Sequence, residues 1–469
     1  MHTLEELLAD ARSCYAAGND EAAKAAYLKV LKLDPCESRA LSELGALALA
    51  TGHRSAARTA YQQAVQCHPI DPAALVDLGN LELQDINGTL ARQHFEAALR
   101  LDAQFPEAHQ GLARALTEAG EHAAAAAHFK QGFTGHALVS LPYRGQGAPV
   151  RVLLLVSTRY GNVSTREFLD NRLFEILVLY AEYFDATQAL PPHDVVFNAI
   201  GDAELCAKAL QSAQQVLQHS SAPLINAPGQ VLKSSRLDNA QRLGKLAGVV
   251  AAETWRVGRG QLAAFAAQHA AEFPLLLRSP GFHMGSHFIL VGDSQELLSS
   301  AAALPGKELL AMGFLDGRGA DGMTRKYRVM IVDGELYPLH LAISAHWKVH
   351  YFSAAMASDP ALREEERRFL DDMPAVLGKT AIEALRSIGA ELGLDYAGVD
   401  FGLSAEGSVL LFEANATMVV AAPPPDPMWD YRRAAIARAR EAAVALVRLR
   451  AAGTAAARKE FKSNIGRSG

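Results

Sequence analysis

The fold of the second half of this chain is decided by two stretches of sequence, AGVDFG at positions 397–402 and LLFEAN at positions 410–415. Both are apolar runs, and a short polar turn separates them, so we expect two paired strands. Glu413 and Asn415 share one face because side chains alternate along a strand, and Asp400 lies on the neighbouring strand. The pairing therefore predicts that three oxygen-bearing side chains lie close together.

Two carboxylates and one amide form a set of hard oxygen ligands, which suits Mg²⁺ holding nucleotide phosphates. Buried carboxylates without a cation would repel each other and destabilise the fold. The alternative interpretation is three polar residues in a solvated hairpin. We favour a metal site made by Asp400, Glu413 and Asn415.

Further elements are expected on both sides of this strand pair. Asp333-Gly334 predicts a tight hairpin between strands at 327–332 and 335–344. A near-continuous apolar run at 150–156 is typical of a strand buried on both faces. The remaining predicted elements are a helix at 166–183, a strand at 194–198, a helix ending at His219, strands at 223–226, 273–278 and 287–291, and a helix at 430–452.

The first 136 residues repeat with a spacing of 34. Small residues facing aromatic residues at this spacing let antiparallel helices approach closely, so we expect stacked helix pairs. Glycine recurs at the turn between the helices of a pair, except where Ile86 breaks the row. The rows are Ala23, Ala57, Ala91 and Ala125; Tyr27, Tyr61, Phe95 and Phe129; Ala11, Gly45, Gly79 and Ala113; and Gly18, Gly52 and Gly120.

This pattern resembles four copies of the tetratricopeptide repeat (TPR). The resemblance implies a right-handed superhelix whose concave face receives a peptide or a partner's tail. A dimerisation or docking module without a ligand of its own is an equal alternative, because a solenoid fold does not name its partner.

Composition excludes several function classes. The net charge of −6 argues against a protein that binds nucleic acid by neutralising phosphates, and no apolar stretch is long enough to span a bilayer. The four cysteines show no metal-binding spacing, so we expect reduced thiols. The N-terminus lacks the pattern of a secretory signal, which makes the cytoplasm the expected location.

The second half resembles the ATP-grasp superfamily, the fold of D-alanine ligases, glutathione synthetases and RimK-type ligases. The resemblance covers roughly residues 150–422, and the acidic triad is its most specific part. It implies that Asp400, Glu413 and Asn415 bind Mg²⁺ ions that bridge the ATP phosphates. ATP and Mg²⁺ are therefore the expected cofactors.

The expected fold is multidomain, with an N-terminal all-α TPR solenoid, an α/β pre-ATP-grasp subdomain and an α+β ATP-grasp fold. The predicted boundaries are 1–136 for the solenoid, 137–149 for a linker, 150–232 for the subdomain, 233–422 for the ATP-grasp domain, and 423–469 for a C-terminal helix and basic tail.

The same resemblance implies an ATP site. Arg278 stands where the family usually has a phosphate-binding lysine, and the loop that follows it would cover the phosphates. Backbone groups around 311–314 would pair with adenine. The second phosphate lysine of the family has no clear counterpart; Lys233, Arg236 and Lys245 are candidates, each better explained as a solvated helix face. The predicted ATP-binding residues are Arg278, Gly281, Gly285, Ser286, Glu308, Ala311, Gly313 and Phe314.

Arg328 keeps the cation that faces the transferred phosphate in the family, while Lys326 replaces an acid. His340 lies in a histidine-rich region after the hairpin and faces the same way as Arg328 only if the strand register permits. We predict catalytic roles for Arg328 and His340. Arg159, Asn198 and Lys348 are the predicted substrate-binding residues, with a capping or ion-pair role equally open for Arg159.

The expected activity is ATP-dependent ligation of a carboxylate to an amine, with the repeats recruiting a peptide or protein substrate. The rival hypotheses are a TPR scaffold with an impaired nucleotide-binding domain and an ATP-grasp kinase. Expected partners are the carboxylate and amine substrates, without nucleic acid or membrane, and a homodimer stays open.

Overall fold

The computed structural model describes residues 3–282, 286–349, 355–423 and 426–453. The chain divides into two compact units. The first unit comprises 1–152 and 170–189, and the second comprises 153–169 and 190–469. The five segments predicted from sequence are finer than this division, and their boundaries stay predictions.

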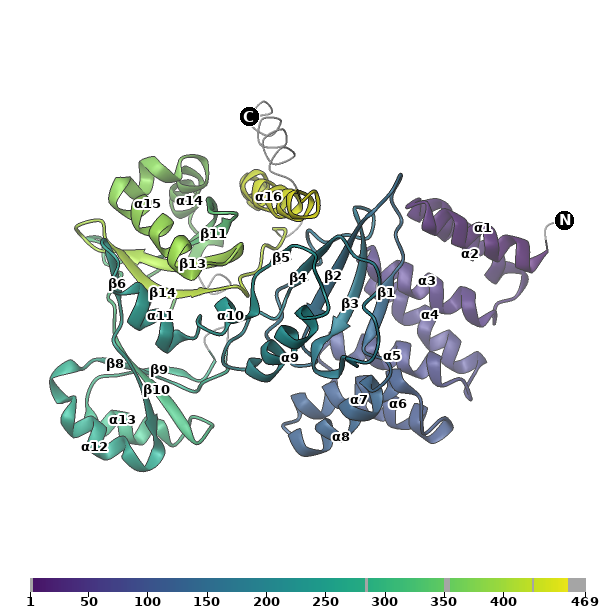
Figure 1. Ribbon diagram of the computed structural model, residues 1–469, viewed down its shortest axis with the longest axis horizontal. Coiled ribbons are helices and arrows are strands. Elements are labelled where there is room, and N and C mark those ends of the chain that lie inside the picture. The colour runs from purple at the N-terminus through teal and green to yellow at the C-terminus, as the bar shows by residue number, and fades with distance from the viewer. Residues whose placement is uncertain (1–2, 283–285, 350–354, 424–425, 454–469) are drawn as a thin grey trace. The chain divides into compact units, whose positions relative to one another are not determined.

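The first unit begins with consecutive antiparallel helix pairs, each helix packing on the next (Figure 1). This run of helices is consistent with a TPR solenoid, and mixed α/β sheets follow it. The helices are α1 (Leu4–Ala16), α2 (Asp20–Leu33), α3 (Ser38–Ala50), α4 (Arg54–Cys67), α5 (Pro72–Gln84), α6 (Gly88–Leu101), α7 (Pro106–Glu118) and α8 (His122–Phe133).

The predicted rows form the contacts between these helices. The small and aromatic rows are buried throughout. A Cβ added to Gly45 would collide with the ring of Tyr61, and one added to Gly79 would lie 2.8 Å from the ring of Phe95. The absence of a side chain at these positions is therefore what lets each aromatic ring lie against the facing helix.

The turns inside the helix pairs adopt a left-handed backbone conformation. Gly18, Gly52 and Gly120 have φ angles of 75°, 84° and 79°. Ile86 holds the equivalent position with φ of 64°, although a β-branched residue rarely adopts this conformation. Its side chain is 89% exposed, so no packing explains the choice of residue.

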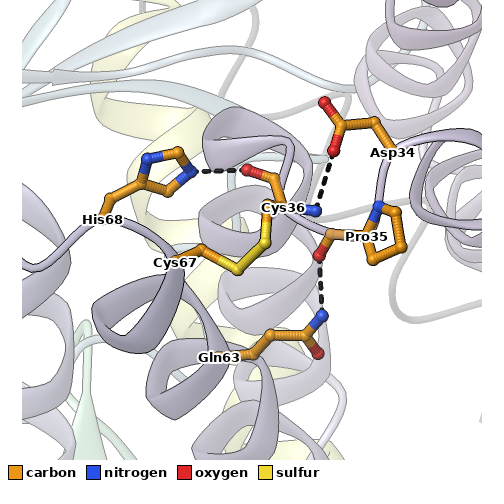
Figure 2. Close-up of a disulfide and its surroundings, with 6 residues drawn as sticks. All are labelled: Asp34, Pro35, Cys36, Gln63, Cys67 and His68. Carbon is orange, nitrogen blue, oxygen red and sulfur yellow. Dashed lines mark hydrogen bonds between the residues drawn. A yellow bond between two sulfur atoms is a disulfide. The ribbon is translucent and has the colours of Figure 1, made fainter.

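Two cysteines of the solenoid form a disulfide, Cys36–Cys67 (Figure 2). The prediction of reduced thiols is wrong for this pair, while Cys14 and Cys206 are thiols. The two cysteines are 31 residues apart, close to one repeat, so stacking of successive repeats brings their Cα atoms to 5.5 Å. Gln63 donates to the Pro35 carbonyl beside the bridge, at 2.6 Å.

The helix predicted at 166–183 is wrong, because strand β3 (Phe174–Tyr180) occupies most of its second half. The run FEILVLY is apolar except for Glu175 and is rich in β-branched and aromatic residues, which favours a strand over an amphipathic helix. β3 pairs antiparallel with β1 (Leu138–Leu141), a strand inside the predicted linker. Phe133 at the end of α8 packs on Tyr180, with ring centroids 4.3 Å apart, so these strands continue the core of the solenoid.

The second unit begins within β2 (Val150–Val156), which spans the division of the chain. β4 and β5 pair in parallel, and Phe168, Phe197 and Tyr396 form an aromatic cluster in its core. The elements of this part are β4 (Val195–Asn198), α9 (Ala207–Leu217), β5 (Leu224–Ile225), α10 (Pro228–Val231) and α11 (Arg236–Leu243).

An antiparallel sheet with strand order β7-β10-β8-β9 follows, covered by α12 and α13 (Figure 1). The predicted strands at 273–278 and 287–291 correspond to β8 and β9. The elements are β7 (Thr254–Gly258), α12 (Leu262–Gln268), β8 (Leu275–Arg278), β9 (Phe288–Val291), α13 (Ser294–Ala301) and β10 (Glu308–Gly313), with short 3₁₀ turns at Arg259–Gln261 and Ala270–Glu272.

The last sheet has the order β12-β11-β13-β14-β6 and contacts α14, α15 and α16. The predicted hairpin is confirmed, and both Asp333 and Gly334 have positive φ as a two-residue turn requires. The elements are β6 (Val249–Ala251), β11 (Thr324–Val332), β12 (Glu335–Ser344), α14 (Pro360–Asp371), α15 (Met373–Leu392), β13 (Tyr396–Leu403), β14 (Val409–Asn415) and α16 (Arg433–Ala451), with 3₁₀ turns at Ala355–Ala357 and Pro427–Arg432.

Candidate active site

Four charged or polar side chains form a row across neighbouring strands of the last sheet. His340 on β12 pairs with Arg328 on β11, Arg328 pairs with Asp400 on β13, and Asp400 pairs with Glu413 on β14. Directly paired residues point to the same face of a sheet. The register therefore permits what the sequence left conditional: His340 faces the same way as Arg328.

Two irregularities flank this row. Arg328 pairs with His340 but Val329 pairs with Pro338, so Leu339 is an extra residue on β12. Asp400 pairs with Glu413 but Phe401 pairs with Leu411, which makes Phe412 the extra residue on β14. Such β-bulges redirect side chains and occur often beside active sites. Here they place each extra apolar residue on the same cavity as its polar neighbour.

Asp400 is buried and is held by two cations. Arg328 Nε lies 2.6 Å from Asp400 Oδ1, and Lys326 Nζ lies 2.9 Å from Oδ2. Burial alone would raise the pKa of Asp400, but the charges of Arg328 and Lys326 outweigh it, so the pKa lies well below its usual range. Asp400 is therefore ionised at neutral pH.

His340 is buried at the end of the row. Burial lowers the pKa of His340 well below its usual range, and the adjacent Arg328 charge lowers it further. The imidazole is consequently neutral at pH 7, a state in which one ring nitrogen donates and the other accepts.

Arg236, at the start of α11, connects the row to another loop. Its guanidinium lies 2.6 Å from Glu413 Oε1 and 3.0 Å from Glu204 Oε2. The side chain is only 10% exposed, so the interpretation of Arg236 as a solvated helix face is wrong. The sequence showed only a basic residue in a polar helix, because its two carboxylate partners are distant in the chain. Lys233 and Lys245 are exposed, as expected.

The row faces a cavity of about 750 Å³ in the second unit. Most predicted site residues line it, although they come from six different strands and two loops. The predicted residues on the cavity are Arg278, Gly313, Phe314, Arg328, His340, Lys348, Asp400, Glu413 and Asn415.

An aromatic cluster lies on the same cavity. The ring centroid of Trp347 is 5.6 Å from that of Phe288 and 6.1 Å from that of Phe314. Arg278 lies above the Phe288 ring, and Lys348 donates to the Phe288 carbonyl at 3.1 Å. Burial, together with the Arg236 charge, lowers the pKa of Arg278 to about 10, so it stays cationic at pH 7.

The other predicted site residues that the structure describes lie outside the lining of this cavity. Glu308 is exposed at the start of β10 and pairs with Arg256, while Ala311 is buried within that strand. Asn198 is buried and donates to the carbonyls of Asn226 and Ile200, which is a structural role. Gly281, Ser286 and Arg159 are also outside the cavity lining, and Gly285 lies outside the described residues.

The predicted metal ligands fit a hard cation by chemistry. Asp400 and Glu413 are direct partners, and Asn415 lies two residues along the same face of β14. Asn415 Oδ1 accepts from the backbone and hydroxyl of Thr417, both at 2.9 Å. A metal would share the two carboxylates with Lys326, Arg328 and Arg236. Over the described residues, no three His, Cys, Asp or Glu side chains form a group able to hold a metal, so the amide would have to complete the set.

No family model matches the chain, and no curated protein matches it. Among solved structures, the N-terminal helical region is similar to a crystal structure of MamA, with 22% identity, a TM-score of 0.26, and coverage of 28% of this chain and 76% of MamA. MamA from Desulfovibrio magneticus RS-1, in a form starting at residue 41, matches with 25% identity, a TM-score of 0.26, and coverage of 28% and 73%. PilF of Pseudomonas aeruginosa matches with 22% identity, a TM-score of 0.27, and coverage of 28% and 61%.

These similarities concern about a quarter of the chain and say nothing of the cavity. None of the helices in the described part of the chain is both long enough and apolar enough to cross a bilayer.

Proposed function

We propose that this protein is an ATP-dependent carboxylate–amine ligase of the ATP-grasp type. The observation that carries the proposal is the row His340, Arg328, Asp400 and Glu413, which lines one cavity together with Arg278 and Lys348. Carboxylates for a metal and cations for phosphates meet there. This is the composition that phosphoryl transfer needs, since its catalysis relies on positioning and charge neutralisation.

The proposed reaction has two steps. A substrate carboxylate oxygen attacks the γ-phosphorus of ATP, the bond to the β-phosphate oxygen breaks, and an acyl phosphate and ADP form. An amine nitrogen then attacks the acyl carbon, inorganic phosphate leaves, the nitrogen loses a proton, and an amide results.

The chain's own residues have distinct parts in this scheme. Asp400, Glu413 and Asn415 would hold Mg²⁺, which when bound neutralises phosphate charge. Arg328 would bind the transferred phosphoryl group, and neutral His340 would hydrogen-bond the reacting carboxylate without adding a second positive charge. Arg278 and Lys348 would bind the remaining phosphates.

The nucleotide base would lie beside the aromatic cluster of Phe288, Phe314 and Trp347, near the backbone of Gly313. The solenoid would recruit a peptide or protein substrate, and the cytoplasm stays the proposed location. A peptide substrate is then expected to have a lower KM than a short fragment carrying the same reactive group.

The direct test measures ADP formation from Mg²⁺ and ATP with libraries of acids and amines. Ligation requires that ADP forms only when acid and amine are both present, and that Asp400→Asn abolishes it. Arg256→Gln, which changes an exposed ion pair away from the cavity, serves as the control. Turnover unaffected by Asp400→Asn would contradict the assignment.

A second candidate is a scaffold that binds nucleotide without turnover. It is favoured by the ion pairs that Asp400 makes with Lys326 and Arg328, and Glu413 with Arg236, because these cations compete with a metal. Binding of ATP without ADP formation under any acid and amine would support it. Phosphate retained on the acceptor would instead indicate a kinase.

A further inference from the structure

The cavity of the second unit has a charged part and an apolar part. The cations on its lining, Arg278, Lys326, Arg328 and Lys348, come from β8, β11 and the loop after β12. The segment Met418-Val419-Val420-Ala421-Ala422, which follows β14, also lines it and carries no charge. Leu339 and Ile436 line the cavity as well.

The apolar segment packs on β13 beside the charged row. Met418 packs directly over Gly398, where any Cβ would collide with the methionine side chain. Gly398 lies on β13 two residues before Asp400, on the same face. The missing side chain at Gly398 therefore allows the segment to lie next to the carboxylate end of the row.

The bulge on β12 adds to this apolar part. Because Leu339 is the extra residue, it lines the cavity together with His340 rather than pointing to the opposite face. Ile436 reaches the cavity from α16, which packs on β12. Apolar side chains from three separate elements thus line the same cavity as His340.

Val419 shows that this part is open. Its side chain is 43% exposed, unlike those of Met418 and Val420, which are buried. An apolar group of a ligand that covers such a solvent-exposed apolar side chain removes apolar surface from water, which favours binding.

We propose that the acid substrate of this site carries an apolar body, which binds against Val419, Leu339 and Ile436 while its carboxylate faces His340 and Arg328. This inference rests on the proposed ligase function and names its substrate class. An acid with a second carboxylate in its body is disfavoured, because that charge would be buried against residues 418–422 without a cation from that segment.

The test measures binding of octanoate, 3-phenylpropionate and succinate to the full chain by calorimetry in the presence of Mg²⁺ and a non-hydrolysable ATP analogue. The two apolar acids are expected to bind at least about tenfold more tightly than succinate. Equal or tighter binding of succinate, or no binding of either apolar acid, would overturn the proposal.

Substitutions at exposed positions test the proposal because they are expected to leave folding unchanged. Val419→Asp is expected to weaken octanoate binding about tenfold or more, and Val419→Lys to shift preference toward succinate. The control is Leu298→Asp, an equally exposed apolar residue on α13 outside the cavity lining, which should change neither. Unchanged octanoate binding in Val419→Asp would overturn the proposal.

Failure of the ligase function is separately visible. Octanoate can bind as described while ADP formation stays absent or independent of Asp400, in which case the reaction assignment fails and the apolar acid site stands. Conversely, Asp400-dependent ligation of succinate in preference to octanoate would contradict only the substrate class.

Discussion

Arg236 Nη2 lies 2.6 Å from Glu413 Oε1, so a predicted metal ligand is already engaged by a cation of its own chain. Arg236 also binds Glu204, whose side chain is 8% exposed. A metal ion at Glu413 would therefore compete with the Arg236 guanidinium, so the binding of the metal would depend on Arg236.

Replacing Arg236 with glutamine tests this competition. The variant should lose about 2–4 kcal/mol of unfolding free energy without Mg²⁺, because the carboxylates of Glu204 and the partly buried Glu413 lose their shared partner. Added Mg²⁺ should then raise its unfolding midpoint more than that of the wild type. Thermal unfolding without MgCl₂ and at MgCl₂ concentrations raised in 10-fold steps measures both effects. Arg256→Gln, which changes an exposed ion pair, is the control. Equal Mg²⁺ responses would argue against metal binding at Glu413.

His340 predicts a pH dependence of stability. The unfolded chain binds a proton at this histidine near its usual pKa of 6.5, whereas burial keeps the folded state neutral well below that value. A depressed folded-state pKa means that stability is full above about pH 6.5 and is lost as the pH falls below it.

The wild type should thus lose about 2 kcal/mol more than His340→Gln between pH 7 and pH 5, from about 1.4 kcal/mol per pH unit. Urea unfolding followed at several pH values measures the difference. His219→Gln, on an exposed position, should keep the wild-type slope. If the stability of His340→Gln fell with pH in parallel with that of the wild type, the pKa of His340 in the folded state would not be lowered.

The turn at Ile86 predicts a stabilising substitution. Ile86→Gly should stabilise the first unit by about 1–2 kcal/mol, because glycine adopts the observed φ of 64° without strain. The reciprocal change Gly52→Ile should destabilise it by a similar amount, since nothing lies near the added Cβ and only the backbone is strained. Unfolding midpoints of the two variants should move in opposite directions; a shift of both in one direction would refute the explanation.

The disulfide Cys36–Cys67 predicts a redox-dependent stability of the solenoid. Reduction, or Cys36→Ser, should lower its unfolding free energy by about 3–4 kcal/mol, from the entropy of a loop of 31 residues. Cys14→Ser should have little effect. A mass-spectrometric count of thiols in protein taken directly from cells also tests the proposed location, because a cytoplasm keeps such pairs reduced.

The sequence was sufficient to predict most of the residues that belong to the candidate site, but not which of them contact each other. Asp400, Glu413 and Asn415 were recognisable because two apolar strands around a short turn make their spacing meaningful. His340 was conditional on register, since a shift by one residue moves a side chain to the other face. Arg236 was interpreted as exposed although it is mostly buried, because its burial depends on Glu204 and Glu413, which lie 32 and 177 residues away.

Local periodicity was sufficient for the stacked helix pairs of 3–133, the hairpin at Asp333-Gly334 and the strands around Asp400, because each follows from contacts between residues close in the chain. Tertiary structure alone decided the disulfide and the two bulges. It also brought the apolar segment after β14 over Gly398. These features depend on which surfaces, distant in the chain, pack together. The packing free energy of such contacts cannot be inferred from the pattern of apolar and polar residues in any single segment.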